Sequence, residues 1–261
     1  MLALSTLLVA ALPMVVPPPV PLTAAHAHND YEHSRPLHDA LACGFCSVEA
    51  DIWLRDGKLL VAHTPFGLKA DRTLQKLYLE PLRERTKRNG GKVFADGPVF
   101  HLMIDVKTEA KETWPALAKV LDEYADLLTV TNDGKTETKA VTVVISGSAD
   151  REGIEKANPR RAAIDGRPKD LETNPSSALV PWVSDAWKNH FKWDGTGDMP
   201  DAERKKLTEY MTKAHTQGRK VRFWATPDKP EVWKELHAAR CDFINTDKLD
   251  ELQAFLLKAR K

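Results

Sequence analysis

The fold is decided by residues 25–64, AHAHNDYEHSRPLHDALACGFCSVEADIWLRDGKLLVAHT. This segment contains three apolar runs, and each run carries a histidine or carboxylates that could act in an active site. His28 ends the first run and His63 ends the third, while Glu49 and Asp51 lie inside the second. Alternate residues of a strand share a face, so the two carboxylates point the same way from Cα atoms about 7 Å apart. Two such carboxylates repel each other unless a cation lies between them, and a hard divalent ion bound through oxygen is the usual solution.

The two histidines can supply the proton transfers that a metal ion does not. Imidazole is the side chain whose ordinary pKa lies nearest neutrality, so a pair of imidazoles beside a phosphate group can deliver and remove protons. A bound metal would hold the charged oxygens while His28 and His63 act on the attacking and leaving ones. We therefore expect residues 25–64 to form an active site.

Apolar runs alternate with helical patterns along the rest of the chain, which predicts parallel strands joined by crossover helices. The predicted strands are residues 24–28, 47–53, 100–106, 141–145, 162–164, 180–183, 221–224 and 243–245. Eight such units in a chain of 261 residues indicate a TIM-type (β/α)8 barrel in one α/β domain, residues 26–261. An extra short strand is expected at residues 58–62, paired through the turn at residues 55–57, which would return His63 to the barrel mouth.

Helical patterns fill the segments between these strands. The clearest helices are expected at residues 74–87, 114–128, 201–217, 231–239 and 249–259. Their apolar residues recur at helical spacing on one face, which indicates packing against the barrel. Residues 166–177 and 189–199 are polar and rich in Gly, Pro and Asp, so loops are expected there.

Polar residues near the carboxyl ends of barrel strands are candidates for a site. Asp105 interrupts a buried strand, and the simplest interpretation is a salt bridge to Lys107, because a lone buried acid is costly. The interpretation that we favour makes Asp105 a third metal carboxylate and Lys107 a point charge for a phosphate oxygen. Trp224 either packs or stacks on a substrate head group. Asp247 is expected to cap the last helix or to contact substrate.

Four motifs resemble the phosphatidylinositol phospholipase C and glycerophosphodiester phosphodiesterase superfamily. HNDY at 28–31, SVEADIW at 47–53 and LVAH at 60–63 match its H-[RN], E-x-D and second His, and IDVK at 104–107 resembles its D-x-K and E-x-K. DRTLQKLYLEPL at 71–82 is similar to a bacterial and fungal branch related to the altered inheritance of mitochondria protein.

The resemblance implies a phosphodiesterase but leaves its substrate open. Asn29 matches the phospholipase C pattern, in which this Asn is a calcium ligand. Asn29 and Asp30 stand where glycerophosphodiesterases have Arg-Gly, and Thr64 stands where they have Asp.

The residues and the resemblance together predict a metal-dependent phosphoric diester hydrolase. One divalent cation, Mg²⁺ or Ca²⁺, would be held by Glu49, Asp51, Asp105 and Asn29. His28 and His63 would act as general acid and base, and Lys107 and Trp224 would bind the substrate, a glycerophosphodiester or a phospholipid. Three alternatives stay open: a lyase that releases a cyclic phosphate, a non-catalytic binder of phosphorylated head groups, and a metal-assisted sugar isomerase.

Composition limits the class of partner. Lys and Arg number 38 against 37 Asp and Glu, a net charge of +1 that gives no reason to expect nucleic-acid binding. Three cysteines, Cys43, Cys46 and Cys241, cannot form a disulfide framework. Other histidines near the motif, His26 among them, are expected on loops or helix surfaces.

The first residues predict export. MLALSTLLVAALPMVV is apolar, short for a transmembrane helix and followed by prolines and small residues, which favours a signal peptide over residues 1–25. The mature protein is then expected in the periplasm or outside the cell. Transient contact with a membrane surface is expected for a lipid substrate, and the oligomeric state stays open.

Overall fold

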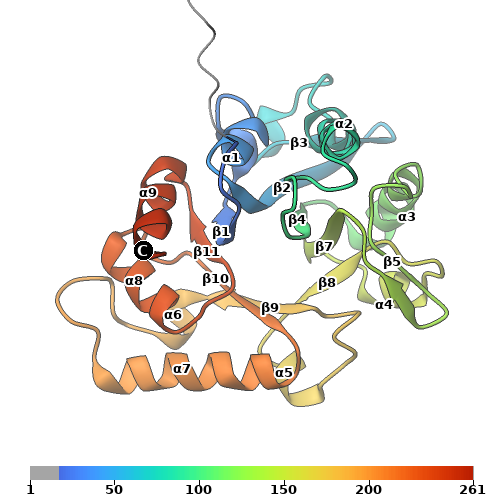
Figure 1. The fold of residues 1–261 in the computed structure, drawn as a ribbon. Helices are drawn as coiled ribbons and strands as arrows, with labels where there is room; N and C mark the ends of the chain where they lie inside the picture. The colour runs from blue at the N-terminus through green and yellow to red at the C-terminus, as the bar shows by residue number, and fades with distance from the viewer. Residues whose placement is uncertain (1–17, 261) are drawn as a thin grey trace, which may run out of the picture.

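Eight parallel strands form a nearly closed barrel in the computed structural model, which describes residues 18–260 (Figure 1). The strands are β1 (Leu22–Ala27), β2 (Phe45–Arg55), β4 (Phe100–Val106), β7 (Val141–Gly147), β8 (Ala163–Gly166), β9 (Trp182–Ala186), β10 (Lys220–Trp224) and β11 (Ile244–Thr246). They follow one another around the sheet in the order β11-β1-β2-β4-β7-β8-β9-β10. The predicted single-domain (β/α)8 barrel is therefore confirmed.

The barrel closes weakly between β10 and β11. One bridge, Arg222 to Phe243, joins these strands, with the Phe243 amide donating to the Val221 carbonyl at 3.2 Å. The strand bounds otherwise follow the predicted ones closely, and β4 matches them. β9 continues to Ala186, beyond the predicted end at Val183, because all five of its residues pair with β10.

The expected extra strand is present as β3 (Lys58–Val61), antiparallel to β2. Asp56 and Gly57 form the two-residue turn with φ values of 49° and 72°, the left-handed conformation that this kind of hairpin requires. The hairpin leads directly to His63, which lies near Asp51 of β2.

Helices cover the outside of the barrel (Figure 1). They are α1 (His38–Ala42), α2 (Glu80–Arg88), α3 (Ala110–Asp122), α4 (Arg151–Lys156), α5 (Asp170–Thr173), α6 (Trp187–His190), α7 (Asp201–Thr216), α8 (Pro230–Ala238) and α9 (Leu249–Ala259). Short 3₁₀ turns occur at η1 (Asp30–Glu32) and η2 (Pro65–Gly67). The last helix has the predicted bounds.

Several segments differ from the prediction. The helix expected at 114–128 is α3, Ala110–Asp122, and α5 lies inside the loop expected at 166–177. The helix expected at 74–87 is a π-helix, η3 (Gln75–Leu79), followed by α2, because Pro81 has no N–H to donate to the preceding turn. A hairpin of β5 (Val130–Asn132) and β6 (Lys135–Glu137) was not predicted. Its strands, VTN and KTE, lack the alternating apolar residues from which a strand is predicted.

A layer of side chains fills the barrel interior. It consists of Met103, Val144, Ala163, Trp182 and Phe243, a cluster separate from the larger core. The Trp182 and Phe243 rings meet edge to face with centroids 4.4 Å apart. This layer separates the two ends of the barrel and supports the polar residues at the carboxyl ends of the strands.

The predicted signal peptide concerns mainly residues 1–17, which lie outside the described residues, and it stays a prediction. Leu22 and Ala25 are buried in β1, so cleavage after Ala25 would remove the first four residues of that strand. A leader compatible with the barrel would end before Leu22. Within residues 18–260, no helix has the length and apolar character needed to cross a membrane.

Candidate active site

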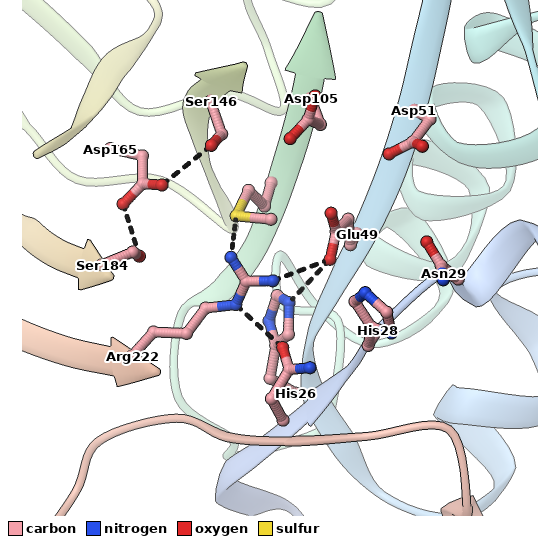
Figure 2. Close-up of polar contacts among 12 residues, drawn as sticks. His26, His28, Asn29, Glu49, Asp51, Asp105, Ser146, Asp165, Ser184 and Arg222 are labelled. Carbon is pink, nitrogen blue, oxygen red and sulfur yellow. Dashed lines mark hydrogen bonds and ion pairs between the residues drawn. The ribbon is translucent and has the colours of Figure 1, made fainter. Parts of the chain in front are cut away.

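Three carboxylates converge at the carboxyl ends of two adjacent strands. Glu49 and Asp51 come from β2 and Asp105 comes from β4, where its Cα is in register with that of Asp51. One carboxylate oxygen from each side chain lies within 4.8 Å of the others, and Figure 2 shows the three groups facing a common space. The spacing E-x-D therefore does place two acids on the inner face, and the neighbouring strand adds the third.

Two cations partly balance these acids. Lys107 Nζ lies 3.0 Å from Asp51 Oδ2 and 3.0 Å from Asp105 Oδ1. The buried Arg222 guanidinium lies 2.9 Å from Glu49 Oε2 and is held by Asn245 at 2.9 Å (Figure 2). Three carboxylates against two cations leave one negative charge.

The pKa values of two of these acids move in opposite directions. Burial alone would raise the pKa of Glu49, but the Arg222 guanidinium outweighs it and holds that pKa at about 2. Burial raises the pKa of Asp51 to about 6, although Tyr31 and Lys107 oppose the shift. The protein's own cations therefore stabilise the charge of Glu49 and leave that of Asp51 incompletely compensated.

The donor set fits a divalent cation. Asp51 Oδ1 is buried and has no hydrogen-bond partner among residues 18–260. An unpartnered buried carboxylate oxygen is costly, and contact with a cation would remove that cost. The available ligand atoms are all oxygens, which suits hard ions such as magnesium or calcium.

Tyr31 links the acids to one histidine and had no role in the prediction. Its hydroxyl lies 2.6 Å from Asn29 Oδ1, 2.7 Å from Asp51 Oδ2 and 3.1 Å from His63 Nδ1. Asn29 adopts a left-handed conformation, with φ 45°, immediately before the turn that carries Tyr31. The buried hydroxyl thus fixes the positions of Asn29, Asp51 and His63 relative to one another.

His28 is oriented by a carboxylate from the far end of the chain. His28 Nδ1 lies 2.8 Å from Asp247 Oδ1, and Figure 2 shows the ring beside Glu49 and Asn29. Burial lowers the pKa of His28, but the hydrogen bond to Asp247 and the charge of Glu49 outweigh burial and raise it. Asp247 therefore does not cap α9 as expected, since Lys248 precedes that helix without a side-chain cap.

His63 lies beside Asp51 and is exposed. Its Nδ1 is 3.4 Å from Asp51 Oδ2. A hollow of about 590 Å³ opens beside it, lined in part by Tyr31, Lys69 and Arg72. The hollow gives a ligand access to His63, and it is also lined by one acid, Glu32.

The structure does not bring Trp224 to the acids. This residue ends β10 with 39% of its surface exposed. Among the described residues, no hydrogen bond or ring contact joins it to Glu49, Asp51 or Asp105.

His26 also differs from its expected place on a loop or helix surface. It is buried in β1, with Nδ1 2.7 Å from Ser47 Oγ and Nε2 3.7 Å from Glu49 Oε2. Its position follows from alternation, because residues 26 and 28 share one face of the strand.

Another buried carboxylate, that of Asp165 in β8, lies across the barrel mouth (Figure 2). It accepts hydrogen bonds from Ser146 Oγ at 2.8 Å and Ser184 Oγ at 2.6 Å, and Arg167 Nη1 lies 2.8 Å away. These contacts tie β7, β8 and β9 together where their ladders are short. Because each oxygen of Asp165 has partners, its role is structural.

Comparison with known proteins agrees with this geometry. Residues 18–164, more than half of the chain, match the AIM6-like phosphodiesterase domain, and residues 220–250 match the glycerophosphoryl diester phosphodiesterase family. The altered inheritance of mitochondria protein 6 homolog of Arthroderma benhamiae is 29% identical over 92% of this chain and 84% of the relative. The Eremothecium gossypii protein is also 29% identical, over 90% of this chain and 69% of its own length.

Two solved structures share the fold. A glycerophosphodiester phosphodiesterase from Parabacteroides distasonis has a TM-score of 0.56 and 15% identity, covering 93% of this chain and 100% of its own. A calcium-dependent phosphoinositol-specific phospholipase C from a Pseudomonas species has a TM-score of 0.58 and 14% identity, covering 88% of this chain and 91% of its own. These structures support the barrel, and the family match shows that the chain belongs to the AIM6-like phosphodiesterase domain family.

Proposed function

We propose that this protein is a metal-dependent phosphoric diester hydrolase that acts on a glycerophosphodiester or a phospholipid-type substrate. One observation carries the proposal: two histidines lie beside a cluster of three carboxylates at the carboxyl ends of the barrel strands, His28 next to Glu49 (Figure 2) and His63 3.4 Å from Asp51. A protein that only binds head groups needs no pair of proton-transfer groups. Membership of a phosphodiesterase family supports the same class of substrate.

The cation in this proposal is Mg²⁺ or Ca²⁺. Its ligands would be Glu49, Asp51, Asp105 and the Asn29 carbonyl oxygen. When bound, the ion withdraws charge from phosphate oxygens and makes a neighbouring hydroxyl more acidic. The Pseudomonas phospholipase C that shares this fold is calcium-dependent, which supports calcium as one of the two ions to test.

The protein's own residues perform the proton transfers and hold the phosphate. Asp247 fixes the ring of His28, and the Tyr31 hydroxyl fixes that of His63, so one ring can take a proton from the attacking oxygen while the other gives one to the leaving oxygen. Lys107 Nζ, held between Asp51 and Asp105, offers a positive charge to a phosphate oxygen.

The leaving group of the substrate identifies which histidine is the general acid. p-Nitrophenolate leaves without protonation, whereas an alkoxide needs a proton. The acid variant, either His28→Ala or His63→Ala, should keep much more of its rate on bis(p-nitrophenyl) phosphate than on a glycerophosphodiester. The other variant should lose rate on both substrates. Wild-type rates in both variants on both substrates would contradict the two-histidine mechanism.

Phosphorus NMR separates hydrolysis from cyclisation. A neighbouring hydroxyl of the substrate can attack first and give a cyclic phosphate, which water then opens. We expect an open phosphomonoester as the final product. A cyclic phosphate that persists at the end of the reaction would show that the protein is a lyase, as in the phospholipase C alternative.

We also propose export and transient contact with a lipid surface. The apolar run at residues 1–16 supports export, and the mature N-terminus of secreted protein tests it by mass spectrometry. A protein that is found inside the cell and still begins with Met1 would contradict export.

Two apolar side chains near the barrel mouth support lipid contact. Phe66 follows His63 with 98% of its surface exposed, and Trp224 ends β10. Phe66→Ala should reduce sedimentation with phosphatidylcholine vesicles while leaving hydrolysis of a soluble diester unchanged. Unchanged sedimentation would contradict membrane contact through Phe66.

A further inference from the structure

A second cavity lies at the opposite end of the barrel from the candidate active site. It has a volume of about 500 Å³, within the range of sites that hold small organic ligands. Most of the barrel strands contribute to it near their amino ends, through residues that include Thr23, Cys46, His101, Thr142, Ala163 and Lys220. The interior layer of Met103, Val144, Ala163, Trp182 and Phe243 separates this cavity from the carboxylates, so the two sites are distinct.

The lining of the cavity combines apolar surface, hydroxyl groups and positive charge. Valine, alanine and proline side chains form apolar walls, and six threonines add hydroxyl groups, among them Thr131 and Thr136 of the β5–β6 hairpin. Arg160, Arg161 and Lys220 supply cations, and no Asp or Glu lines the cavity within the described part of the chain. This composition suits a ligand with an apolar body and a negatively charged head.

Arg160 provides the strongest reason to expect an anion. Only 8% of its surface is exposed, and its Nη1 donates to the carbonyl oxygens of Ala162 and Ala178 at 3.1 and 3.0 Å. Among residues 18–260, no carboxylate lies within the 4.0 Å of an ion pair, and Nε and Nη2 have no hydrogen-bond partner. Buried charges are normally paired, so this guanidinium has donors available for an anion in the cavity.

The other two cations are less available. Arg161 Nε already lies 2.9 Å from Asp122 Oδ1. Lys220 Nζ is 3.7 Å from Asp242 Oδ1 and lies over the Phe243 ring. Arg160 is therefore the cation in this cavity that forms no ion pair within residues 18–260. Burial lowers its pKa, and the charge of Glu155, which lies beyond ion-pair distance, offsets that shift only in part.

We infer that this cavity is a second ligand site, which binds a small amphiphile with one anionic head on Arg160 and an apolar body against the valine and alanine walls. A carboxylate and a phosphate monoester both match the planar donor pattern of the guanidinium. The ring of His101, stacked on Trp182 with centroids 5.8 Å apart, forms part of the wall.

Isothermal titration calorimetry with three eight-carbon ligands tests this inference. Octanoate and octyl phosphate are the two anionic ligands, and octanol is the neutral control. We expect at least one anion to bind roughly tenfold or more tightly than octanol, because pairing with a buried cation is a large part of the affinity. The tighter anion identifies the preferred head group, and equal affinity for all three ligands would overturn the inference.

Variants show where the anion binds. Arg160→Met should weaken binding at least roughly tenfold, whereas Arg161→Met, which removes a charge already paired with Asp122, should change it less than about threefold. Thr142→Trp fills the cavity without changing its charge and should abolish binding, and Thr142→Val should preserve it. Thr142→Trp decides the question if Arg160→Met does not fold.

Asp105→Asn provides the last control because it alters only the candidate active site. Anion binding should be unchanged in this variant. Binding that survives Thr142→Trp, or that disappears in Asp105→Asn, would overturn the inference and assign the ligand to another site.

Discussion

The two ends of this barrel balance charge in opposite ways. At the carboxyl end, three acids face two cations, and Asp51 keeps one buried oxygen without a partner in the described chain. At the amino end, Arg160 is a buried cation with only carbonyl partners, and no acid lines its cavity within residues 18–260. One end therefore lacks positive charge and the other lacks negative charge, which suits the first to a metal ion and the second to an anion.

The largest loss of activity should come from replacing the histidine of one of two similar histidine–aspartate pairs. His28 pairs with Asp247 at the carboxyl end, and His215 pairs with Asp242 near the amino end, each at 2.8 Å. His28→Ala should lower the hydrolysis of a glycerophosphodiester by roughly 10²–10⁴-fold, the usual contribution of a general acid or base. His215→Ala should leave the rate within about twofold. Steady-state kinetics on both variants checks the difference, and similar losses in both would show that the effect is structural.

A glycine at the end of β7 should be the next most sensitive position. Gly147 has φ +67°, and a Cβ there would clash with Asp105 Oδ1 and lie 2.5 Å from the Val106 carbonyl oxygen. Gly147→Ala should displace Asp105 and weaken metal affinity and activity roughly 10–100-fold. The control is Gly134→Ala in the β5–β6 turn, where φ is +75° but nothing lies within 4 Å. Equal metal affinity in both variants would refute a positioning role for Gly147.

Removal of the Tyr31 hydroxyl should have a smaller effect. Tyr31→Phe leaves Asn29, Asp51 and His63 without their shared contact, and we expect activity to fall roughly tenfold. Tyr78→Phe removes an equally buried hydroxyl, which lies 2.9 Å from Asp30 outside the acid cluster. That control should keep its activity although it also loses stability. Metal titrations of both variants show whether the loss concerns the site.

Replacement of His101 at the amino end should have the smallest effect on activity. Its effect should instead be on how the free energy of unfolding depends on pH. Burial, helped by the Lys220 charge, lowers the pKa of His101 from 6.5 to about 3. The unfolded chain then binds more protons than the folded chain below pH 6.5, so the free energy of unfolding falls as the pH falls toward 3.

The contribution of His101 should be up to roughly 2 kcal/mol between pH 7 and pH 5. His101→Gln should remove this part of the pH dependence and keep wild-type hydrolysis at pH 7. Urea unfolding of both proteins at pH 7 and pH 5 measures the change in the free energy of unfolding between the two pH values. An unchanged difference between pH 7 and pH 5 in the variant would contradict the assignment to His101.

Periodicity made the barrel and the acid cluster predictable. The E-x-D spacing places Glu49 and Asp51 on one face of a strand, and Asp105 follows from the next parallel strand in register. Arg222 could have been found in the same way, because it shares a face with Trp224, which was already a candidate for the barrel mouth. The contact between His28 and Asp247 follows from barrel closure, which places β11 beside β1.

Other features depend on side-chain packing and leave no pattern in the sequence. Tyr31 lies on a 3₁₀ turn, and its three contacts arise from the conformation of that turn. The β5–β6 hairpin is exposed and polar, so the Asp133-Gly134 turn was its only signal. The absence of an ion pair to Arg160 within residues 18–260 depends on how the surrounding side chains pack, since Glu155 is close in the chain but acts only from beyond ion-pair distance.

The most direct test of the proposed function is metal removal and restoration in a diester hydrolysis assay. Purified protein treated with EDTA should lose hydrolysis of bis(p-nitrophenyl) phosphate and regain it with Ca²⁺ or Mg²⁺. Asp51→Asn should stay inactive at metal concentrations that restore the wild type, because it lacks a negatively charged ligand at the cluster. Hydrolysis that is indifferent to EDTA, or that Asp51→Asn retains at the wild-type rate, would contradict a metal-dependent site at the carboxyl end of this barrel.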